Sequence, residues 1–512
     1  MNTANKRMAV NTAILYFKLV FTIVVNLYST RLILGGLGVE DYGIVNLISG
    51  IVAMLSFVNT SMTVSTQRYL SVSYGKNDLE LQLRIFNTSI VLHVLIGLII
   101  VGLLELAIPV VFHSAIQIPS ARVNAARVLY QLTILGTFFT IVSVPYDATL
   151  NAHENMLVYS IASIIESLIR LLGAILLLKY QNDRLVFYGL LIVAIRFVSF
   201  CIKSIYSRLK YSDAVLKRGL FSSSLMREMF SFSTWNAFGA FALTARNQGI
   251  AFVLNIFKGV VINSAYGIAT QVLGQLSNFV ATIQKAMNPQ IMQREGAGNS
   301  SGMLSLALKQ SKYSSFLLLF FLLPLMFEMP YVLKLWLKTV PEYSIDFCRL
   351  IIVLSFFQQL TSGLQSAIQA RGDIRKYQIT ISCVLLLNIP LAFFILSNGL
   401  HVSYVLLGMV MIECVCLIIR VFFAHKLVGL RYEVLFKELL KPVALAYFVS
   451  FGILSLLHKL PYFSTSHGFF AFFVFFILSC LITAVIILFS LNNEERRMIR
   501  SLIRVHIGEK VC

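Results

Sequence analysis

The chain has 512 residues, of which 58% are hydrophobic and only 12% are charged, and its mean hydropathy is +0.82. A soluble protein of this size could not keep so much apolar surface away from water, so the composition excludes a soluble globular protein and is typical of a polytopic membrane protein. The net charge of +20 would suggest nucleic acid in a soluble chain, but here we attribute it to basic loops near anionic lipid head groups and expect no nucleic-acid partner.

A helix needs about 20 apolar residues to cross the hydrocarbon core of a membrane. By that rule the sequence predicts an all-α fold of about fourteen spans, which are joined by short loops without a soluble domain. The first span follows the basic stretch MNTANKRMAV and lacks a small-residue cleavage site, so we interpret it as an uncleaved span. In chain order the predicted spans are 9–30, 44–66, 86–112, 124–145, 157–178, 185–206, 229–256, 261–284, 313–333, 347–369, 378–397, 403–424, 442–458 and 469–490.

Lys and Arg concentrate in the segments between alternate spans, with the strongest bias at 203–228, at 420–441 and in the tail from Arg496 to Lys510. Because basic loops stay on the cytoplasmic side, both termini are predicted to be cytoplasmic.

The two halves of the chain resemble each other, which predicts two six-span lobes related by a pseudo-twofold axis along the membrane normal. Tyr42-Gly43 recurs as Tyr266-Gly267, and a second set of residues recurs at a shift of about 218 positions. The predicted domains are an N-lobe at 1–206, a basic cytoplasmic linker at 207–228, a C-lobe at 229–425, and two further spans with a basic tail at 426–512. The second set pairs Phe138, Phe139, Ala152 and Tyr159 with Phe356, Phe357, Ala370 and Tyr377.

Several spans carry polar residues along one helical face. The second span ends its polar face at Gln67, the seventh contains Asn247 next to Arg246, and the tenth contains Gln358 and Gln365. Small polar residues can simply join helices. Long amides and full charges favour instead a water-filled cavity between the two lobes.

Charged residues inside the spans are the sharpest functional signal. In SIIESLIRLLGAILLL, Glu166 and Arg170 lie one turn apart and can pair. Lys18, Arg196 and Arg246 have no such local partner, and a cation in the middle of a membrane costs at least about 3 kcal/mol. Snorkelling to the surface could account for Arg196 and Lys18.

These charges predict a hydrated cationic cavity for an anionic substrate, since Arg suits phosphate or pyrophosphate. Carboxylates within or beside the spans are candidates for coupling transport to H⁺ or Na⁺, and no other cofactor is expected. The substrate-binding candidates are Lys18, Gln67, Arg170, Arg196, Arg246, Asn247, Gln358 and Gln365, and the ion-coupling candidates are Asp147, Glu166 and Glu413.

Enzymatic function is disfavoured by the sequence. The seven cysteines and eight histidines form no catalytic or metal-binding constellation, so we expect no metal site and no disulfide. A P-loop of the GxxxxGK[ST] type is absent, so ATP hydrolysis by this chain is not expected.

The chain resembles the polysaccharide-exporting branch of the multidrug/oligosaccharidyl-lipid/polysaccharide exporter superfamily, and in particular the O-antigen and capsule flippases (Wzx-type). The resemblance covers most of the chain and depends on the order and spacing of short motifs. These are RLILGGLGVEDYGIVNL, TQRYLSVSYGKNDLE, AMNPQIMQREGAGN, LKLWLKTVPEYSIDFCRL and AIQARGDIRKYQ.

This resemblance implies that an undecaprenyl-pyrophosphate-linked oligosaccharide is flipped from the inner to the outer leaflet of the bacterial inner membrane by alternating access. It also implies a polysaccharide polymerase and chain-length machinery as partners. Drug exporters of the superfamily typically carry an acid in or near the first span, whereas this chain has Lys18 there. A lipid II flippase and a cation-coupled multidrug antiporter stay open as alternatives.

Overall fold

The computed structural model describes residues 3–53, 56–112, 119–217, 219–337, 340–460, 463, 468–492 and 495–496. These residues form helices and no β-strand, which confirms the predicted all-α fold. The chain divides into two compact units. The N-terminal unit comprises Ala9–Ala240 and Met292–Gly298, and the C-terminal unit comprises Met1–Met8, Phe241–Ile291 and Asn299–Cys512.

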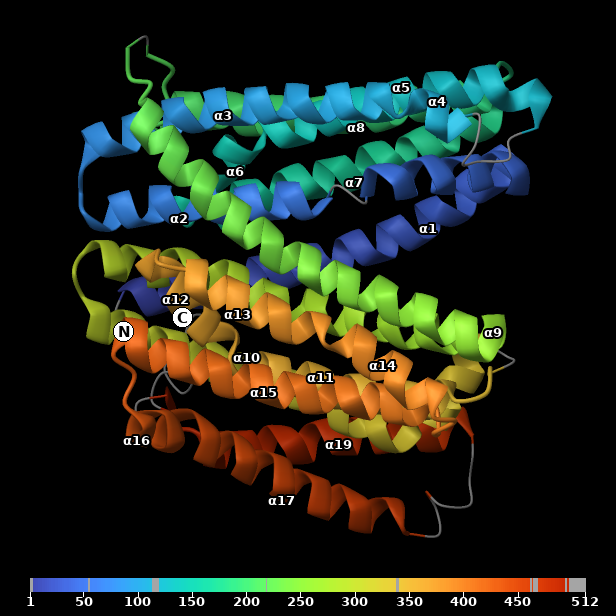
Figure 1. Ribbon diagram of the computed structural model, residues 1–512, viewed down its shortest axis with the longest axis vertical. Helices are drawn as coiled ribbons and strands as arrows, with labels where there is room; N and C mark the ends of the chain where they lie inside the picture. Colours follow the sequence, from blue (N-terminus) through green and yellow to red (C-terminus); the bar gives the residue numbers. More distant parts are fainter. Residues whose placement is uncertain are drawn as a thin grey trace, which may run out of the picture. The chain divides into compact units, whose positions relative to one another are not determined.

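The helices of the N-terminal unit follow one another with short connections (Figure 1). The long helix α9, Ser223–Gly296, contributes to both units. The others are α1 Thr3–Ala53, α2 Ser56–Gly75, α3 Leu79–Leu106, α4 Ile108–Val110, η2 Ser120–Arg122, α5 Val123–Val142, α6 Val144–Ala152, α7 Met156–Lys179 and α8 Arg184–Lys210.

The C-terminal unit continues after α9 with a further series of helices. Its elements after α9 are α10 Ser300–Leu337, α11 Ser344–Leu360, α12 Ser362–Arg371, α13 Arg375–Leu386, α14 Asn388–Ser397, α15 Ser403–Val428, α16 Tyr432–Leu435, η3 Phe436–Leu440, α17 Lys441–His458 and α19 Phe469–Ser490. The domain boundaries predicted from the sequence stay predictions.

Ten helices of the described chain are long and apolar enough to cross a membrane, or eleven if the bent pair α11–α12 counts as one span. The predicted spans at 44–66, 229–256 and 261–284 are absent from this set but lie on α1–α2 and α9, which are helical. The polar residues of 229–256 and 261–284 lower the hydropathy of these segments, and 44–66 includes positions 54–55, which lie outside the described residues. The structure is therefore compatible with fourteen spans, and the count stays a prediction.

Two glycines bend the long helices at corresponding places. Gly38 in α1 has φ 79° and ψ 170°, and Gly259 in α9 has φ 76° and ψ −171°. Only glycine adopts this conformation without strain, so each helix continues past its bend in a new direction. The two bends are separated by 221 positions (259 minus 38).

Gly75 and Gly296 have the same separation, and both belong to the N-terminal unit. A Cβ atom at Gly75 would overlap the carbonyl of Gln293, and one at Gly296 would overlap the carbonyl of Val72. The ends of α2 and α9 therefore meet backbone to backbone through a reciprocal contact, as expected for two equivalent segments about a twofold axis.

A second set of breaks recurs at a shift of 218 positions, the same shift that the sequence suggests. α5 passes into α6 at Ser143, before Pro145, and α11 passes into α12 at Thr361 with a bend of 41°. The adjacent ring pairs Phe138–Phe139 and Phe356–Phe357 recur with the breaks. These features are compatible with a parallel internal repeat.

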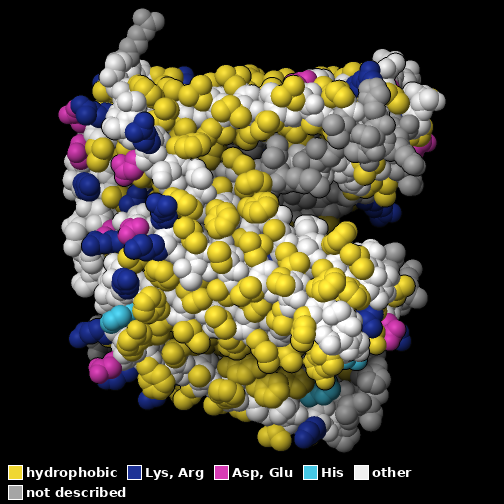
Figure 2. All heavy atoms as spheres, viewed as in Figure 1, with side chains coloured by type: hydrophobic (Ala, Val, Ile, Leu, Met, Phe, Trp, Pro, Cys, Tyr) yellow, Lys and Arg dark blue, Asp and Glu magenta, His cyan; other side chains and the backbone are white. Residues whose placement is uncertain are grey.

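Within the N-terminal unit, small residues allow the helices to pack closely. The Cα of Gly173 in α7 lies against Leu191 of α8, and that of Gly189 in α8 lies against Leu132 of α5. Such contacts are typical of helices in membranes. Figure 2 shows that hydrophobic side chains cover the sides of the helices, whereas Lys and Arg gather mostly near helix ends, which is the distribution expected of lipid-facing surfaces.

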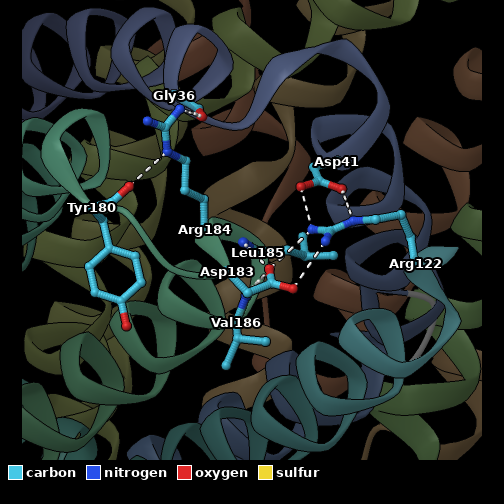
Figure 3. Close-up of polar contacts among 8 residues, drawn as sticks. All are labelled: Gly36, Asp41, Arg122, Tyr180, Asp183, Arg184, Leu185 and Val186. Atoms are coloured by element: carbon cyan, nitrogen blue, oxygen red, sulfur yellow. Dashed lines mark hydrogen bonds and ion pairs between the residues drawn. The ribbon is translucent and has the colours of Figure 1, made fainter.

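An ionic clamp holds one end of the N-terminal unit together (Figure 3). Arg122 binds both carboxylate oxygens of Asp41 at 2.8 and 2.5 Å, and both oxygens of Asp183 at 3.0 Å. Arg184 donates to the carbonyl of Gly36 at 2.9 Å. The clamp therefore fixes the part of α1 around its Gly38 bend to η2 and to the start of α8.

Partial burial by itself would raise the pKa of Asp183, but the hydrogen bonds and charge of Arg122, together with the amides of Val186 and Leu185, hold that pKa below its ordinary value. This contribution to folding stability is present above the carboxyl pKa of the unfolded chain. It is lost as the pH falls through the lowered pKa of the folded chain, that is, below about pH 4.

We predict that Asp183→Asn lowers the melting temperature of the purified protein at neutral pH, and that the difference from wild type shrinks as the pH falls below about 4. The loss should not exceed about 1 kcal/mol, because the Asp183 side chain is 37% exposed. Thermal unfolding of both proteins in detergent over a pH series measures this loss. A difference in melting temperature that does not change with pH would contradict an ionic role of the Asp183 carboxylate.

Candidate functional site

A cavity of about 480 Å³ with both polar and aliphatic lining residues lies in the N-terminal unit. α1, α5 and α8 supply most of its wall, and α2, α3 and α7 contribute one residue each. Its size is that of a small-molecule site. The charged and polar lining residues are Thr30, Tyr42, Asn46, Ser49, Asn59, Thr133, Thr137, Thr140, Arg170, Tyr188 and Arg196.

The two charged residues of this lining are both arginines, Arg170 from α7 and Arg196 from α8. Arg170 makes no hydrogen bond or ion pair with any residue that the structure describes. The predicted pairing of Arg170 with Glu166 is not found, because the Glu166 carboxylate contacts α8 instead. Arg196 is 43% exposed, and its Nη1 lies 3.9 Å from Glu166 Oε2, which is a loose pair.

Beside the cavity, Lys203 joins the two acidic candidates of the N-terminal unit. Its Nζ lies 3.0 Å from Asp147 and 3.9 Å from Glu166, and its side chain is only 9% exposed. Ser199 donates a short hydrogen bond to Glu166, and the Ser143 hydroxyl at the α5–α6 break lies 3.4 Å from Asp147. Both carboxylates are thus held by α8, on the helical face that also carries Arg196.

Tyr159 of α7 connects this network to the first span. Lys18 Nζ lies 5.3 Å and Lys203 Nζ lies 5.6 Å from the centroid of the Tyr159 ring. Such distances permit cation–π attraction. The four cations Lys18, Arg170, Arg196 and Lys203 therefore accompany two carboxylates, which leaves an excess of positive charge around the cavity.

Arg246 lies in a different environment, in the C-terminal unit. Its Nη1 lies 3.6 Å from Glu413 Oε2, while Arg420 Nη1 lies 2.7 Å from Glu413 Oε1. The side chains of Arg246 and Glu413 are 1% and 0% exposed. Neither residue lines the cavity of the N-terminal unit. The pair is therefore withdrawn from water and holds α9 to α15.

The polar candidates of the C-terminal unit surround this cluster. Asn247 accepts hydrogen bonds from Arg246, and Gln358 donates to Glu413 at 3.3 Å. The hydroxyl of Thr361, at the α11–α12 break, accepts from Arg420 at 3.1 Å. The carboxylate of Glu413 thus has two guanidinium partners and an amide.

Gln365 and Gln67 lie apart from both clusters. Gln365 is half-buried in α12, and Gln67 is 8% exposed in α2 with its amide nitrogen unpaired within the described chain. The substrate-binding and ion-coupling roles assigned to these residues from sequence stay predictions.

Sequence reasoning missed Lys203 because it was assigned to the basic loop after the sixth span. The signal that could have found it is its position seven residues after Arg196, two turns further along the same face of one helix. The threonine series Thr133, Thr137 and Thr140 was also missed, although its spacing of four and three marks one helical face.

Comparison with known proteins gives a family and a fold. Residues 5–294 match the family model described as polysaccharide biosynthesis protein, and no curated protein matches the sequence. Among solved structures, a MATE protein in the bent conformation is similar with a TM-score of 0.74, 14% identity, and coverage of 83% of this chain and 96% of that chain.

Two further structures share that identity and that coverage, each with a TM-score of 0.73. One is an outward-facing multidrug resistance MATE family transporter of the MOP superfamily, and the other is a MOP superfamily transporter from Pyrococcus furiosus, which is described as having a binding pocket of reverse polarity. At this identity the likeness shows the fold alone.

The family match covers more than half of the chain, so the resemblance seen in the sequence is confirmed at the level of the family. Together, family and fold support a membrane exporter and fit a protein that is not an enzyme. This chain belongs to the polysaccharide biosynthesis protein family and is a multi-pass membrane protein with the fold of the MATE and MOP transporters.

Proposed function

We propose that the protein exports an undecaprenyl-pyrophosphate-linked oligosaccharide, the repeat unit of an O-antigen, capsule or exopolysaccharide, from the inner to the outer leaflet of the bacterial inner membrane. The observation that carries the proposal is the cavity of the N-terminal unit, where Arg170 has no partner among the described residues and Arg196 is loosely paired. The predicted two lobes would alternate access to this cavity, with both termini in the cytoplasm.

The charge of the cavity favours an anionic substrate. Its lining, as far as the structure describes the chain, contains two arginines and no Asp or Glu. An unpaired guanidinium in a membrane span is costly unless it faces water or binds an anion. The planar fork of Arg matches phosphate oxygens in a bidentate geometry, so a pyrophosphate head group would supply the partner that Arg170 lacks among the described residues.

The neutral part of the lining suits sugars. The hydroxyls of Thr133, Thr137 and Thr140 donate to carbonyls of their own helix at 2.8, 2.8 and 3.0 Å. Each hydroxyl oxygen therefore retains lone pairs that can accept a hydrogen bond from a sugar hydroxyl. Asn46, Asn59 and the two tyrosines add further polar groups.

The charge of the cavity and the phenotype of a gene deletion distinguish the alternative functions. A multidrug antiporter for cations would require acidic groups in the cavity, and the lining offers basic ones. A lipid II flippase would share the phosphate chemistry, so deletion of the gene separates the two: loss of a surface polysaccharide supports the proposal, and loss of viability supports lipid II transport. The glycan that accumulates on the inner leaflet then identifies the substrate.

Ion coupling is proposed at Asp147 and Glu166 rather than at Glu413. The first two side chains are 18% and 24% exposed and share one lysine, so H⁺ or Na⁺ can reach them. Glu413 is fully buried between two guanidinium groups, which compete with any incoming cation. A polysaccharide polymerase and chain-length machinery are the proposed protein partners.

We predict that Arg170→Ala reduces export at least about tenfold, because a hydrogen bond to a charged group contributes about 1.5–3 kcal/mol. Arg170→Lys should retain part of the activity. Lys179→Ala, at the exposed end of the same helix, is the matched control. Surface polysaccharide in a complemented deletion strain is the measurement, normalised to protein in the membrane. Normal export by Arg170→Ala would refute the cationic-cavity assignment.

We predict that Arg246→Ala acts differently and destabilises the protein by about 3 kcal/mol, because it leaves part of a buried carboxylate unpaired. The melting temperature and the amount of folded protein should fall, whereas Lys258→Ala, exposed on the same helix, should leave both unchanged. A stable Arg246→Ala variant that no longer exports would instead assign Arg246 to substrate binding.

A further inference from the structure

A second cavity, of about 460 Å³, lies in the C-terminal unit where α10 begins, α15 ends, and α16 and η3 follow. Each of these is the end of a candidate membrane span: Ser300–Leu337, Ser403–Val428 and Tyr432–His458. The cavity is therefore at the level of the membrane–water interface. In the predicted orientation this interface is the cytoplasmic one.

Two cations in this cavity have no partner among the described residues. Lys309 of α10 and Arg431, just before α16, both line the cavity and make no hydrogen bond or ion pair there. A third cation, Lys312, is already neutralised: it is 1% exposed, and its Nζ lies 2.7 Å from Glu495. The free positive charge of the cavity therefore comes from Lys309 and Arg431.

One carboxylate limits the charge that the cavity can accept. Glu438 lines it and accepts a hydrogen bond from Asn492 at 2.8 Å. Lys309 and Arg431 against Glu438 leave one net positive charge, with Lys312 and Glu495 cancelling each other. This charge matches a singly charged phosphodiester better than a pyrophosphate, which carries more negative charge.

The remaining lining is amphipathic. Three hydroxyl-bearing residues at the start of α10, Ser300, Ser301 and Ser305, lie on the polar side, where the positive end of the helix dipole also favours an anion. Leu304, Leu308 and Val434 supply an apolar side. A ligand with a phosphate and adjoining hydrocarbon would satisfy both sides at once.

We infer that this cavity is a binding site for an anionic phospholipid with a single phosphodiester charge, such as phosphatidylglycerol. Lys309 and Arg431 bind the phosphate, the Ser305 hydroxyl donates to one of its oxygens, and the leucine side chains contact the beginning of the acyl chains. Basic pockets between helices at an interface are the usual form of such lipid sites. The site is separate from the cavity proposed for the exported substrate and does not depend on that proposal.

The test uses the full-length protein in phosphatidylcholine nanodiscs that contain increasing phosphatidylglycerol or, in a parallel series, increasing phosphatidylethanolamine. Retained lipid is measured by native mass spectrometry, and the melting temperature is measured in parallel. Lys309→Ala/Arg431→Ala should weaken phosphatidylglycerol binding about 25-fold, since each charge near the membrane surface contributes about a factor of five. Lys309→Gln/Arg431→Gln, which retains more side-chain volume, should show the same loss if the alanine variant is poorly folded.

Lys334→Ala/Lys426→Ala is the matched control, because it removes two exposed charges of the same unit that do not line the cavity. Equal weakening in this control would show general attraction to the membrane and would overturn the site. Equal retention of phosphatidylethanolamine would overturn the assignment to an anionic lipid. Displacement of the lipid by inorganic phosphate would show that the cavity binds the free anion and would overturn the lipid assignment.

Discussion

The cost of placing charge in a low-dielectric membrane governs the polar architecture of this protein. Each charged side chain inside a span must have an opposite charge, a wet surface or a ligand. The two units meet this requirement differently. In the C-terminal unit Glu413 is enclosed by Arg246 and Arg420 and is withdrawn from water. In the N-terminal unit cations exceed carboxylates, and the excess faces a cavity.

A comparison of one helix from each unit, α15 and α8, shows how this difference arises. α15 carries Glu413 and Arg420 seven residues apart, so the acid and the base pair within one helix. α8 has two cations, Arg196 and Lys203, at the same spacing, so these two residues cannot pair with each other. The acidic partners of these cations come from α6 and α7. Lys203 pairs with both of them, Asp147 and Glu166. Arg196 is left loosely paired, and Arg170 has no acidic partner among the described residues.

Irregular backbone supports both clusters. The breaks at Ser143 and Thr361 interrupt helices within candidate membrane spans, and in a membrane unpaired backbone groups are costly unless they lie within protein. Each break also supplies a hydroxyl to the nearby charges: Ser143 to Asp147, and Thr361 to Arg420. The bends at Gly38 and Gly259 act on a larger scale, and the clamp around Arg122 fixes the first of them. Breaks and bends recur at shifts of 218 and 221 positions, which is compatible with the predicted internal repeat.

The sequence by itself determined the membrane class, the all-α fold, the family and the presence of unusual intramembrane charges, because hydropathy and charge are properties of local composition. It could not determine which charges meet. Glu166 and Arg170 are neighbours on one helical face, yet Glu166 binds α8; Arg246 has no local partner, yet it is paired with Glu413 from α15. Tertiary structure alone decided these pairings, because ion pairs between helices depend on which faces pack together, and one sequence of apolar spans is compatible with many packings.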